Sequence, residues 1–547
     1  MTISNTPQWL QTANTKRRLR DDLIQAFVET HKAHSEVRIP PISAKDSQID
    51  DAKLLHLVGT GTTKGNAQDP LAIDSVEEIL QAILSGVVTA SQLLNAYIHR
   101  QTGTSPLTEV LFDNAIQQAN ELDEYFQNNG RLVGPLHGVP MTLKDQFDVQ
   151  GYDSTLGYVG RAFKPATRDC ALVSLLKEMG AIIVAKSNLP QSIMWCETEN
   201  PLWGLTVHPR NPAFTPGGST GGEGTLLSLR GTVIGWGTDI GAYNTRLPYR
   251  GVSVSTEGQE HVPSVIGPMT RNIESLIAVT KAVIERSPWD RDPKCCPVPW
   301  RPEIFEQARS RPLVVAVMRD DGVVRPHPPV TRVLEEVVAK LEKAGHEVVS
   351  WTPGSLHKEC IEIMDQYYTA DGGEDIQRDV EAGGEPFIPH VEVLVNRGKP
   401  ISVYNYWQLN KQKIAAQERY LDLWNASKSP TGKQIDILLT PVMPHSAVPH
   451  RKCRWVGYTK VFNFVDYPAV VLPAGHVSKE LDADAAQSMD SYQPRNAIDE
   501  WNWNVFDLEK MDGMPIGVQV VARRLQEEKA LGAAQAIDKI LRGSVEP

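Results

Sequence analysis

The sequence predicts an α/β fold organised around a largely parallel sheet. The first indication is a set of short apolar runs of strand length at residues 139–143, 181–185 and 313–317. The second is order, because a helical pattern at 170–179 precedes one of these strands and another at 330–345 follows a different one. The third is size, since 547 residues, 41% of them hydrophobic, suffice for a large core. Alternating strands and helices are typical of βαβ units.

The boundaries of these segments carry the expected stop signals. Gly180 follows the first helical pattern and Gly345 closes the second, and glycine readily adopts the left-handed conformation that ends a helix. A strand at 346–350 comes directly after the second helix. Further elements are predicted as strands at 435–439 and 518–521 and as a last helix at 527–541.

The N-terminal part predicts a helical extension before the main domain. Apolar side chains recur there at helical spacing, at Leu19, Leu23, Ile24 and Phe27. The basic run at 16–20 is followed directly by two aspartates, which favours a solvated helix face. We expect the extension to span residues 1–70 and a single large domain to span 71–547.

Three helices are predicted at the start of this domain. The first, at 76–84, is capped by Ser75, and Glu78 completes a capping box. The other two end near Arg100 and Phe126. This helical region leads into the first predicted strand.

Charge and cysteine content exclude several classes of function. With 55 basic and 66 acidic residues the net charge is −11, which disfavours binding to nucleic acid or to an anionic membrane. The six cysteines are scattered without a CxxC pair, so a zinc site is not expected. Free cysteines of this kind favour a reducing environment. No apolar run reaches transmembrane length, and the N-terminus lacks the apolar core of a signal peptide. We expect a cytoplasmic protein without metal or membrane partner.

Candidate chemistry is concentrated in a glycine-rich stretch at residues 215–250. It begins Thr-Pro-Gly-Gly-Ser-Thr-Gly-Gly-Glu-Gly, with Ser219 and Thr220 between two pairs of glycines. Glycine lets main-chain N–H groups approach a ligand closely. A second motif, residues 134–145, passes from an apolar run directly to Lys144. A lysine that a buried strand delivers to a site has a lowered pKa and can act as a base.

These motifs resemble those of the amidase signature hydrolases, in particular fungal acetamidase-like members. Residues 134–145 are similar to that family's lysine motif, and 200–204 with 215–224 are similar to its glycine/serine motif. Three later segments also match, at 438–444, 463–469 and 514–519. The resemblance implies a single large α/β/α domain, with a central twisted mixed sheet covered by helices. It also implies neither a metal nor an organic cofactor.

The family hydrolyses amides with a serine–serine–lysine triad, so the resemblance implies roles for single residues. Lys144 would be the base, and Ser219 would be the bridging serine on a cis peptide after Gly218. Stabilisation of the oxyanion would come from the main-chain N–H groups of Ile240, Gly241 and Ala242. Candidates for substrate contact, some by resemblance and some as aromatic wall residues, are Met194, Trp195, Thr220, Thr245, Tyr367 and Trp455.

The family's nucleophilic serine has no counterpart in this chain. The family pattern Gly-Thr-Asp-Ile-Gly-Gly-Ser-Ile-Arg faces Gly-Thr-Asp-Ile-Gly-Ala-Tyr-Asn-Thr-Arg at residues 237–246. Counting from the left places Tyr243 at the serine position. Counting back from Arg246 places Asn244 there, so the loop also holds one extra residue. Ala242 replaces a family glycine as well.

Three functions remain open at this point. The one that the missing serine favours is non-hydrolytic acid/base chemistry on a small carbonyl or amide metabolite, such as cyclisation, elimination or isomerisation, with Lys144, Ser219 and Tyr243 moving protons. The alternative is hydrolysis of an amide C–N bond with Ser219 or Thr245 as nucleophile. The third is a catalytically inactive binding protein.

Two regions of the second half are predicted by composition alone. Residues 290–435, mostly helical from 353 onward, are expected to shape the substrate pocket as an insertion region. Residues 476–500, rich in Asp, Ser, Ala and Gln, are expected to form a surface loop. The expected partners are a small-molecule substrate and a second copy of the chain in a homodimer.

Overall fold

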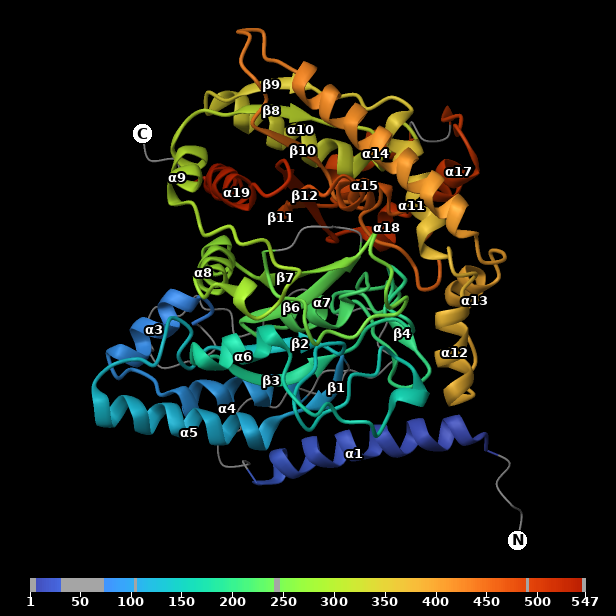
Figure 1. Cartoon of the computed structure of the whole chain (residues 1–547). Coiled ribbons are helices and arrows are strands. Elements are labelled where there is room, and N and C mark those ends of the chain that lie inside the picture. The colour runs from blue at the N-terminus through green and yellow to red at the C-terminus, as the bar shows by residue number, and fades with distance from the viewer. Residues whose placement is uncertain (1–5, 31–72, 103–105, 241–245, 488–490, 544–547) are drawn as a thin grey trace.

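A computed structural model describes residues 6–30, 73–102, 106–240, 246–487 and 491–543 of the chain. Within these ranges the protein has two five-stranded sheets and a two-stranded ribbon, with helices around them (Figure 1). Both large sheets are mixed, so the predicted α/β class with helix-covered mixed sheets is confirmed. The strands are divided between two sheets, where the sequence predicted one.

The first sheet, in the lower half of Figure 1, has the strand order β1-β3-β2-β6-β7. Its strands are β1 (Leu107–Val110), β2 (Pro140–Lys144), β3 (Ile182–Ser187), β6 (Ile234–Ile240) and β7 (Ser264–Thr270). The central strand β2 runs parallel to both neighbours, β3 and β6, and each of its five residues is buried. A side chain at the end of β2 therefore emerges inside the protein.

The second sheet has the order β11-β12-β10-β8-β9. Its strands are β8 (Val314–Val317), β9 (Glu347–Ser350), β10 (Ile437–Pro441), β11 (Ala469–His476) and β12 (Pro515–Val521). Strands β8 and β9 are parallel and are joined by helix α10 (Pro328–Lys343), which confirms the predicted βαβ unit. The short ribbon pairs β4 (Glu199–Asn200) with β5 (Gly204–Leu205).

Helices cover both sheets. Around the first sheet lie α3 (Val76–Leu84), α4 (Ala90–Gln101), α5 (Phe112–Asn129), α6 (Ala171–Glu178), α7 (Gly221–Ser228) and α8 (Ile273–Ile284). Around the second lie α9 (Pro302–Ser310), α10, α11 (Leu356–Tyr368), α14 (Val403–Ala426), α15 (Gly457–Val465) and α19 (Glu527–Leu541). The capping box of Ser75 and Glu78 is present at the start of α3, which has the predicted bounds.

The remaining helices are short. They are α12 (Glu374–Gly383), α13 (Pro389–Val395), α16 (Lys479–Gln487), α17 (Ala497–Asn504) and α18 (Leu508–Met511), with single 3₁₀ turns at Val159–Arg161 and Pro288–Asp290. Helices α16 and α17 correct the prediction of a surface loop over 476–500. The Asn496 side chain caps α17 by accepting from the N–H groups of Ile498 and Asp499, a local signal that composition alone does not show.

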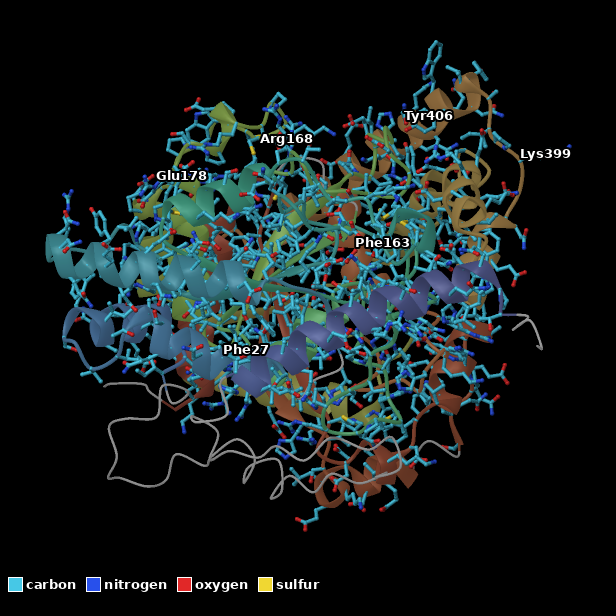
Figure 2. All side chains as sticks on the ribbon, turned by 90° about the horizontal axis from the view of Figure 1, so that it is seen from below. Phe27, Phe163, Arg168, Glu178, Lys399 and Tyr406 are labelled. Carbon is cyan, nitrogen blue, oxygen red and sulfur yellow. The ribbon has the colours of Figure 1, made fainter. Side chains whose placement is uncertain are left out.

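Helix α1 (Gln8–Thr30) packs along the outside of the first sheet and crosses the face seen in Figure 2, with Phe27 close to one of its ends. The basic run predicted to be solvated instead docks this helix. Lys16 Nζ lies 2.5 Å from a Glu109 carboxylate oxygen and 2.7 Å from one of Asp153. Arg17 donates to two main-chain carbonyls, and only Arg18 of these three is exposed. The predicted end of the extension at residue 70 lies outside the described residues.

Two features are absent from the described residues. None of the helices there is long and apolar enough to cross a membrane. Nor does that part of the chain gather three or more histidine, cysteine or acidic side chains in a way that could hold a metal ion.

Candidate active site

The last residue of β2, Lys144, is fully buried. Burial lowers the pKa of its amine to about 7, because desolvation disfavours the ammonium form. The negative charges of Asp239 and Glu223 oppose this shift without cancelling it. A substantial fraction of Lys144 is therefore a neutral amine near pH 7, and only the neutral amine can accept a proton.

Ser219 lies beside this amine, in the turn that precedes α7. Its Oγ is 2.7 Å from Lys144 Nζ, and its side chain is partly exposed. The Gly218–Ser219 peptide is cis, as the resemblance implied. A Cβ at position 218 would lie 2.6 Å from the main-chain nitrogen of Glu197, so only glycine allows this turn to pack so closely on its neighbour. The glycine-rich motif thus positions a hydroxyl between the buried amine and solvent.

Thr238, on β6, fixes the orientation of the Lys144 amine. Lys144 Nζ is 2.9 Å from Thr238 Oγ1, and Thr238 Oγ1 donates to Gln146 Oε1 at 2.7 Å. Gln146 Nε2 in turn donates to the carbonyl of Ser253 at 2.8 Å. Because the Thr238 proton is used on Gln146, Thr238 can only accept from Lys144. The lone pair of the neutral amine is then left for the Ser219 hydroxyl.

Sequence reasoning assigned no role to Thr238 or Gln146. Both had a weak signal, since Thr238 belongs to the motif at 237–246 and Gln146 lies two residues after Lys144. Distinguishing a hydroxyl that orients the base from one that merely packs requires the contact with Gln146, which joins residues 92 positions apart.

Glu223, in the first turn of α7, is a second buried titratable group near the amine. Thr142 Oγ1 donates to its Oε2 at 2.5 Å, across from β2. Burial raises the pKa of Glu223 to about 7, although the hydrogen bonds from Thr142 and Ser187 and the charge of Lys144 pull the other way. The contact joins the first turn of α7 to the central strand β2.

Several predicted residues follow directly on β6. Ile240 ends the strand, whereas Gly241, Ala242, Tyr243 and Thr245 lie outside the described residues, as does Asn244. Their predicted roles as oxyanion donors, acid/base group and substrate contact stay predictions.

Arg246 resumes the described chain and is almost fully buried. Its guanidinium binds Glu528 with two bonds, Nη1 to Oε2 at 2.9 Å and Nη2 to Oε1 at 2.8 Å. Nη1 also lies 2.8 Å from Glu527 Oε2. The chain is therefore anchored at Arg246.

The predicted substrate-contact residues fall into three places. Thr220 is next to Ser219 and donates to the Thr238 carbonyl at 3.2 Å, so it belongs to the Lys144 group. Trp195 stacks on His390 with 4.5 Å between ring centroids. Met194, Tyr367 and Trp455 pack in one hydrophobic cluster, and whether any of them contacts substrate stays a prediction.

A cavity of about 570 Å³, within the range typical of ligand pockets, opens beside α14. His261 lines it and lies three residues before Ser264, which pairs with Ile240 at the end of β6. Arg523 and Arg524, shortly before the glutamates that bind Arg246, line it as well. Lys144, Ser219 and Thr238 are not among the residues that line this cavity.

The chemistry available at this site is proton transfer and nucleophilic attack. A neutral amine, held by Thr238, faces a hydroxyl that reaches toward solvent. An amine with a pKa near the working pH is suited to act as a general base. A hydroxyl activated in this way can attack a carbonyl carbon.

Comparison with known proteins gives a consistent set of relatives. The Amidase family profile matches residues 91–242 and 244–531, leaving residue 243 between the matched segments. Amidase 1 of Gibberella moniliformis is 50% identical over 522 residues, which cover 91% of this chain and 99% of that protein. Acetamidase of Emericella nidulans is 36% identical over 537 residues, covering 94% and 96%. Among solved structures, fatty acid amide hydrolase superposes with a TM-score of 0.85 at 27% identity, covering 98% of this chain and 95% of that one.

Proposed function

The chain belongs to the amidase family, and on that premise we propose that it hydrolyses a carboxamide with Lys144 as the base and Ser219 as the nucleophile. One observation carries the assignment of roles. A fully buried amine, with its pKa lowered to about 7, lies 2.7 Å from a serine hydroxyl that is partly exposed. Such a pair can generate an alkoxide-like nucleophile at neutral pH.

The proposed reaction has two half-steps. Ser219 Oγ attacks the amide carbonyl carbon while its proton passes to Lys144 Nζ. The C–N bond breaks as that proton moves to the leaving nitrogen, which departs as an amine or ammonia and leaves an ester on Ser219. Water then attacks the ester carbon, returns a proton to Ser219 Oγ through Lys144, and releases the carboxylic acid.

The main alternative is the non-hydrolytic reaction that the missing serine favoured at the level of sequence. Relatives named amidase and acetamidase, matched over more than nine-tenths of this chain, support hydrolysis instead. The inactive binding protein has a specific argument against it. Lys186 is as deeply buried as Lys144 but bonds to the carbonyl of Asp153 and the hydroxyl of Ser154, whereas the amine of Lys144 lies beside the partly exposed hydroxyl of Ser219, where a base can act on a nucleophile.

We also propose that residues 290–435 shape the pocket, as the sequence predicts. The support is that α14, which lies in this region, supplies part of the wall of the 570 Å³ cavity, which is a candidate pocket although Lys144 and Ser219 do not line it. Acyl groups of different length then offer a means of testing how far the pocket extends.

The test is turnover of a panel of amides with short aliphatic, aromatic and long acyl groups, followed by trapping with a fluorophosphonate. Peptide mass spectrometry would locate the adduct. Ser219→Ala and Lys144→Met should each abolish turnover, whereas Ser228→Ala, an exposed serine at the end of α7, should not change it.

The outcomes separate the alternatives. A fluorophosphonate adduct on Ser219 supports the proposal. An adduct on Thr245 or Tyr243 would keep amide hydrolysis and overturn the choice of nucleophile. If neither hydrolysis nor an adduct is found, and an amide of the panel is instead rearranged or undergoes elimination, the result would support the non-hydrolytic reaction.

A further inference from the structure

Helix α14 has two apolar faces. Its inner face packs Leu409, Ala416, Tyr420 and Trp424 into the hydrophobic cluster beside α11 and α15. Its outer face also carries large apolar side chains, and these are exposed: Val403 by 67%, Trp407 by 60%, Ile414 by 56% and Leu421 by 40%. Figure 1 shows the helix on the outside of the molecule, and in Figure 2 Tyr406 and Lys399 mark the margin from which its N-terminal end projects. Polar residues such as Asn410 and Gln417 lie between these side chains, but several large apolar groups exposed on one helix face still mark a candidate interaction surface.

The outer residues are spaced symmetrically along the helix. Trp407 and Leu421 each lie seven residues from Ile414, on opposite sides of it. Seven residues are nearly two helical turns, so the three side chains share one stripe. If a second α14 packs antiparallel with its Ile414 on the first, Trp407 of each helix meets Leu421 of the other. A twofold-symmetric contact requires this self-complementarity.

We propose that this stripe, Trp407–Ile414–Leu421 on α14, is a homodimer interface that pairs two copies of the chain antiparallel. The charged residues beside the stripe fit the same arrangement. Lys411 and Glu418 are both exposed and lie on the same side of the stripe. Lys411 is three residues before Ile414, and Glu418 is four residues after it. A twofold axis through Ile414 brings Lys411 of one copy next to Glu418 of the other, twice. In the described part of the chain neither residue forms an ion pair of its own.

A second copy suits this surface better than a lipid bilayer. Helices that bind anionic membranes carry an excess of lysine and arginine beside the apolar face, whereas here Lys411 is balanced by Glu418. The chain as a whole has a net charge of −11, which repels an anionic surface. Opposite charges in a symmetric order instead complement themselves.

The proposed interface lies next to the cavity described above. Ile414, Glu418 and Leu421 belong to the stripe or its flank and also line that cavity. The partner helix would therefore lie along the rim of the cavity in each copy. Contact through one helix is small, so we expect a dissociation constant on the order of 10 μM.

The experiment is sedimentation equilibrium of the full chain over about 1 to 100 μM, a range that brackets the expected constant. Ile414→Asp should leave only monomer, because two carboxylates would meet on the twofold axis. Leu481→Asp, which charges a leucine that is 65% exposed on α16, is the matched control and should dimerise like the wild type. Thermal melts verify that both variants fold.

A charge exchange tests the register. Lys411→Glu should weaken the dimer about fivefold or more, because each Glu418 then faces a like charge. The double exchange K411E/E418K should restore the wild-type constant to within about twofold. A wild type that stays monomeric, a double exchange as weak as the single one, or a monomer that cosediments with phosphatidylserine/phosphatidylcholine vesicles through this stripe would overturn the proposal.

Discussion

Thr238 Oγ1 accepts from Lys144 Nζ at 2.9 Å and donates its own proton to Gln146 Oε1 at 2.7 Å. The direction of these two bonds determines which part of the amine faces Ser219. If both neighbouring hydroxyls could donate, the lone pair of the amine could accept from either one. Here the hydroxyl of Thr238 already donates to Gln146, so only the hydroxyl of Ser219 can donate to the amine. The positioning of the base therefore depends on a residue that takes no part in bond making.

Thr238→Val should lower kcat about tenfold to a hundredfold and leave KM within about twofold of the wild type. The valine keeps the shape of the threonine but cannot accept from Lys144, so the lone pair is no longer aimed at Ser219. Steady-state kinetics on an amide that the wild type hydrolyses provide the measurement. Thr232→Val is the control, since Thr232 is also buried and its hydroxyl donates to the nearby carbonyl of Ile234. Equal kcat in the two variants would remove Thr238 from the mechanism.

The pH dependence of kcat/KM should follow the Lys144 amine. Its pKa is lowered from 10.5 to about 7 by burial, and the neutral form is the base. Activity should therefore fall below a midpoint near pH 7 and reach a plateau above it. A midpoint near 10 would mean that the base is an ordinary, solvated lysine, and a rate that falls with rising pH would mean that the ammonium form is required.

Lys144→Met should abolish activity without loss of stability near pH 7. The unfolded lysine keeps its proton up to about pH 10.4, whereas the folded one releases it near 7, so between these values the folded state binds fewer protons. Stability from this group is therefore lowest at and below pH 7 and rises toward pH 10. The free energy of unfolding of the wild type, relative to the methionine variant, should rise by roughly 3 kcal/mol between pH 7 and 10. Urea unfolding at both pH values measures it, and a constant difference would contradict the burial of the charge.

Much of the fold could be predicted because its elements carry local signals. Helix α3 begins at its capping residue Ser75, and α6 is followed by Gly180 with a φ of +87°. Two strands that escaped prediction, β6 and β7, lack such signals. β6 alternates glycine with larger residues, and β7 contains both a glycine and a proline, so neither reads as an apolar run. They are strands because β2 offers an open edge to β6, and β6 in turn to β7.

The residues of the candidate site were likewise predictable only where they belong to a sequence motif. Lys144 and Ser219 were predicted because each belongs to a motif, and the structure places them 2.7 Å apart. Thr238 and Gln146 were not assigned roles, because their importance arises from contacts between distant segments. The lysine and arginine of residues 16 and 17 were taken as solvated for a similar reason. Their partners, Glu109, Asp153 and the carbonyls of residues 201 and 202, lie far away in the sequence.

Arg17→Met should lower the free energy of unfolding by roughly 2 kcal/mol. Arg17 Nε and Nη2 donate to the carbonyls of Leu202 and Pro201, each at 2.6 Å, and methionine leaves those carbonyls without these donors. Arg18→Met is the matched control, because Arg18 is the next residue and is exposed, so its effect should be within about 0.5 kcal/mol. Chemical denaturation of both variants gives the comparison. Similar values for the two would mean that α1 is held by its apolar residues alone.

Arg246→Met should be the most destabilising of these substitutions, at about 3 kcal/mol or more. The cost arises chiefly at Glu528, which is fully buried and would lose the two-bond contact with the guanidinium. Arg301 still binds Glu528, with 2.6 Å between Nη2 and Oε2, so the carboxylate is not left wholly unpaired and the loss stays near the lower limit for a buried pair. Arg309→Met removes an exposed pair with Glu306 and should cost less than about 1 kcal/mol.

If the cost at 246 is electrostatic, Glu528→Gln in the Arg246→Met background should recover part of it, since burying the amide costs less free energy than burying the unpaired charge. A double variant less stable than Arg246→Met would show instead that Arg301 alone satisfies Glu528, and that Arg246 acts through its bonds to the carbonyls of Val298 and Pro299.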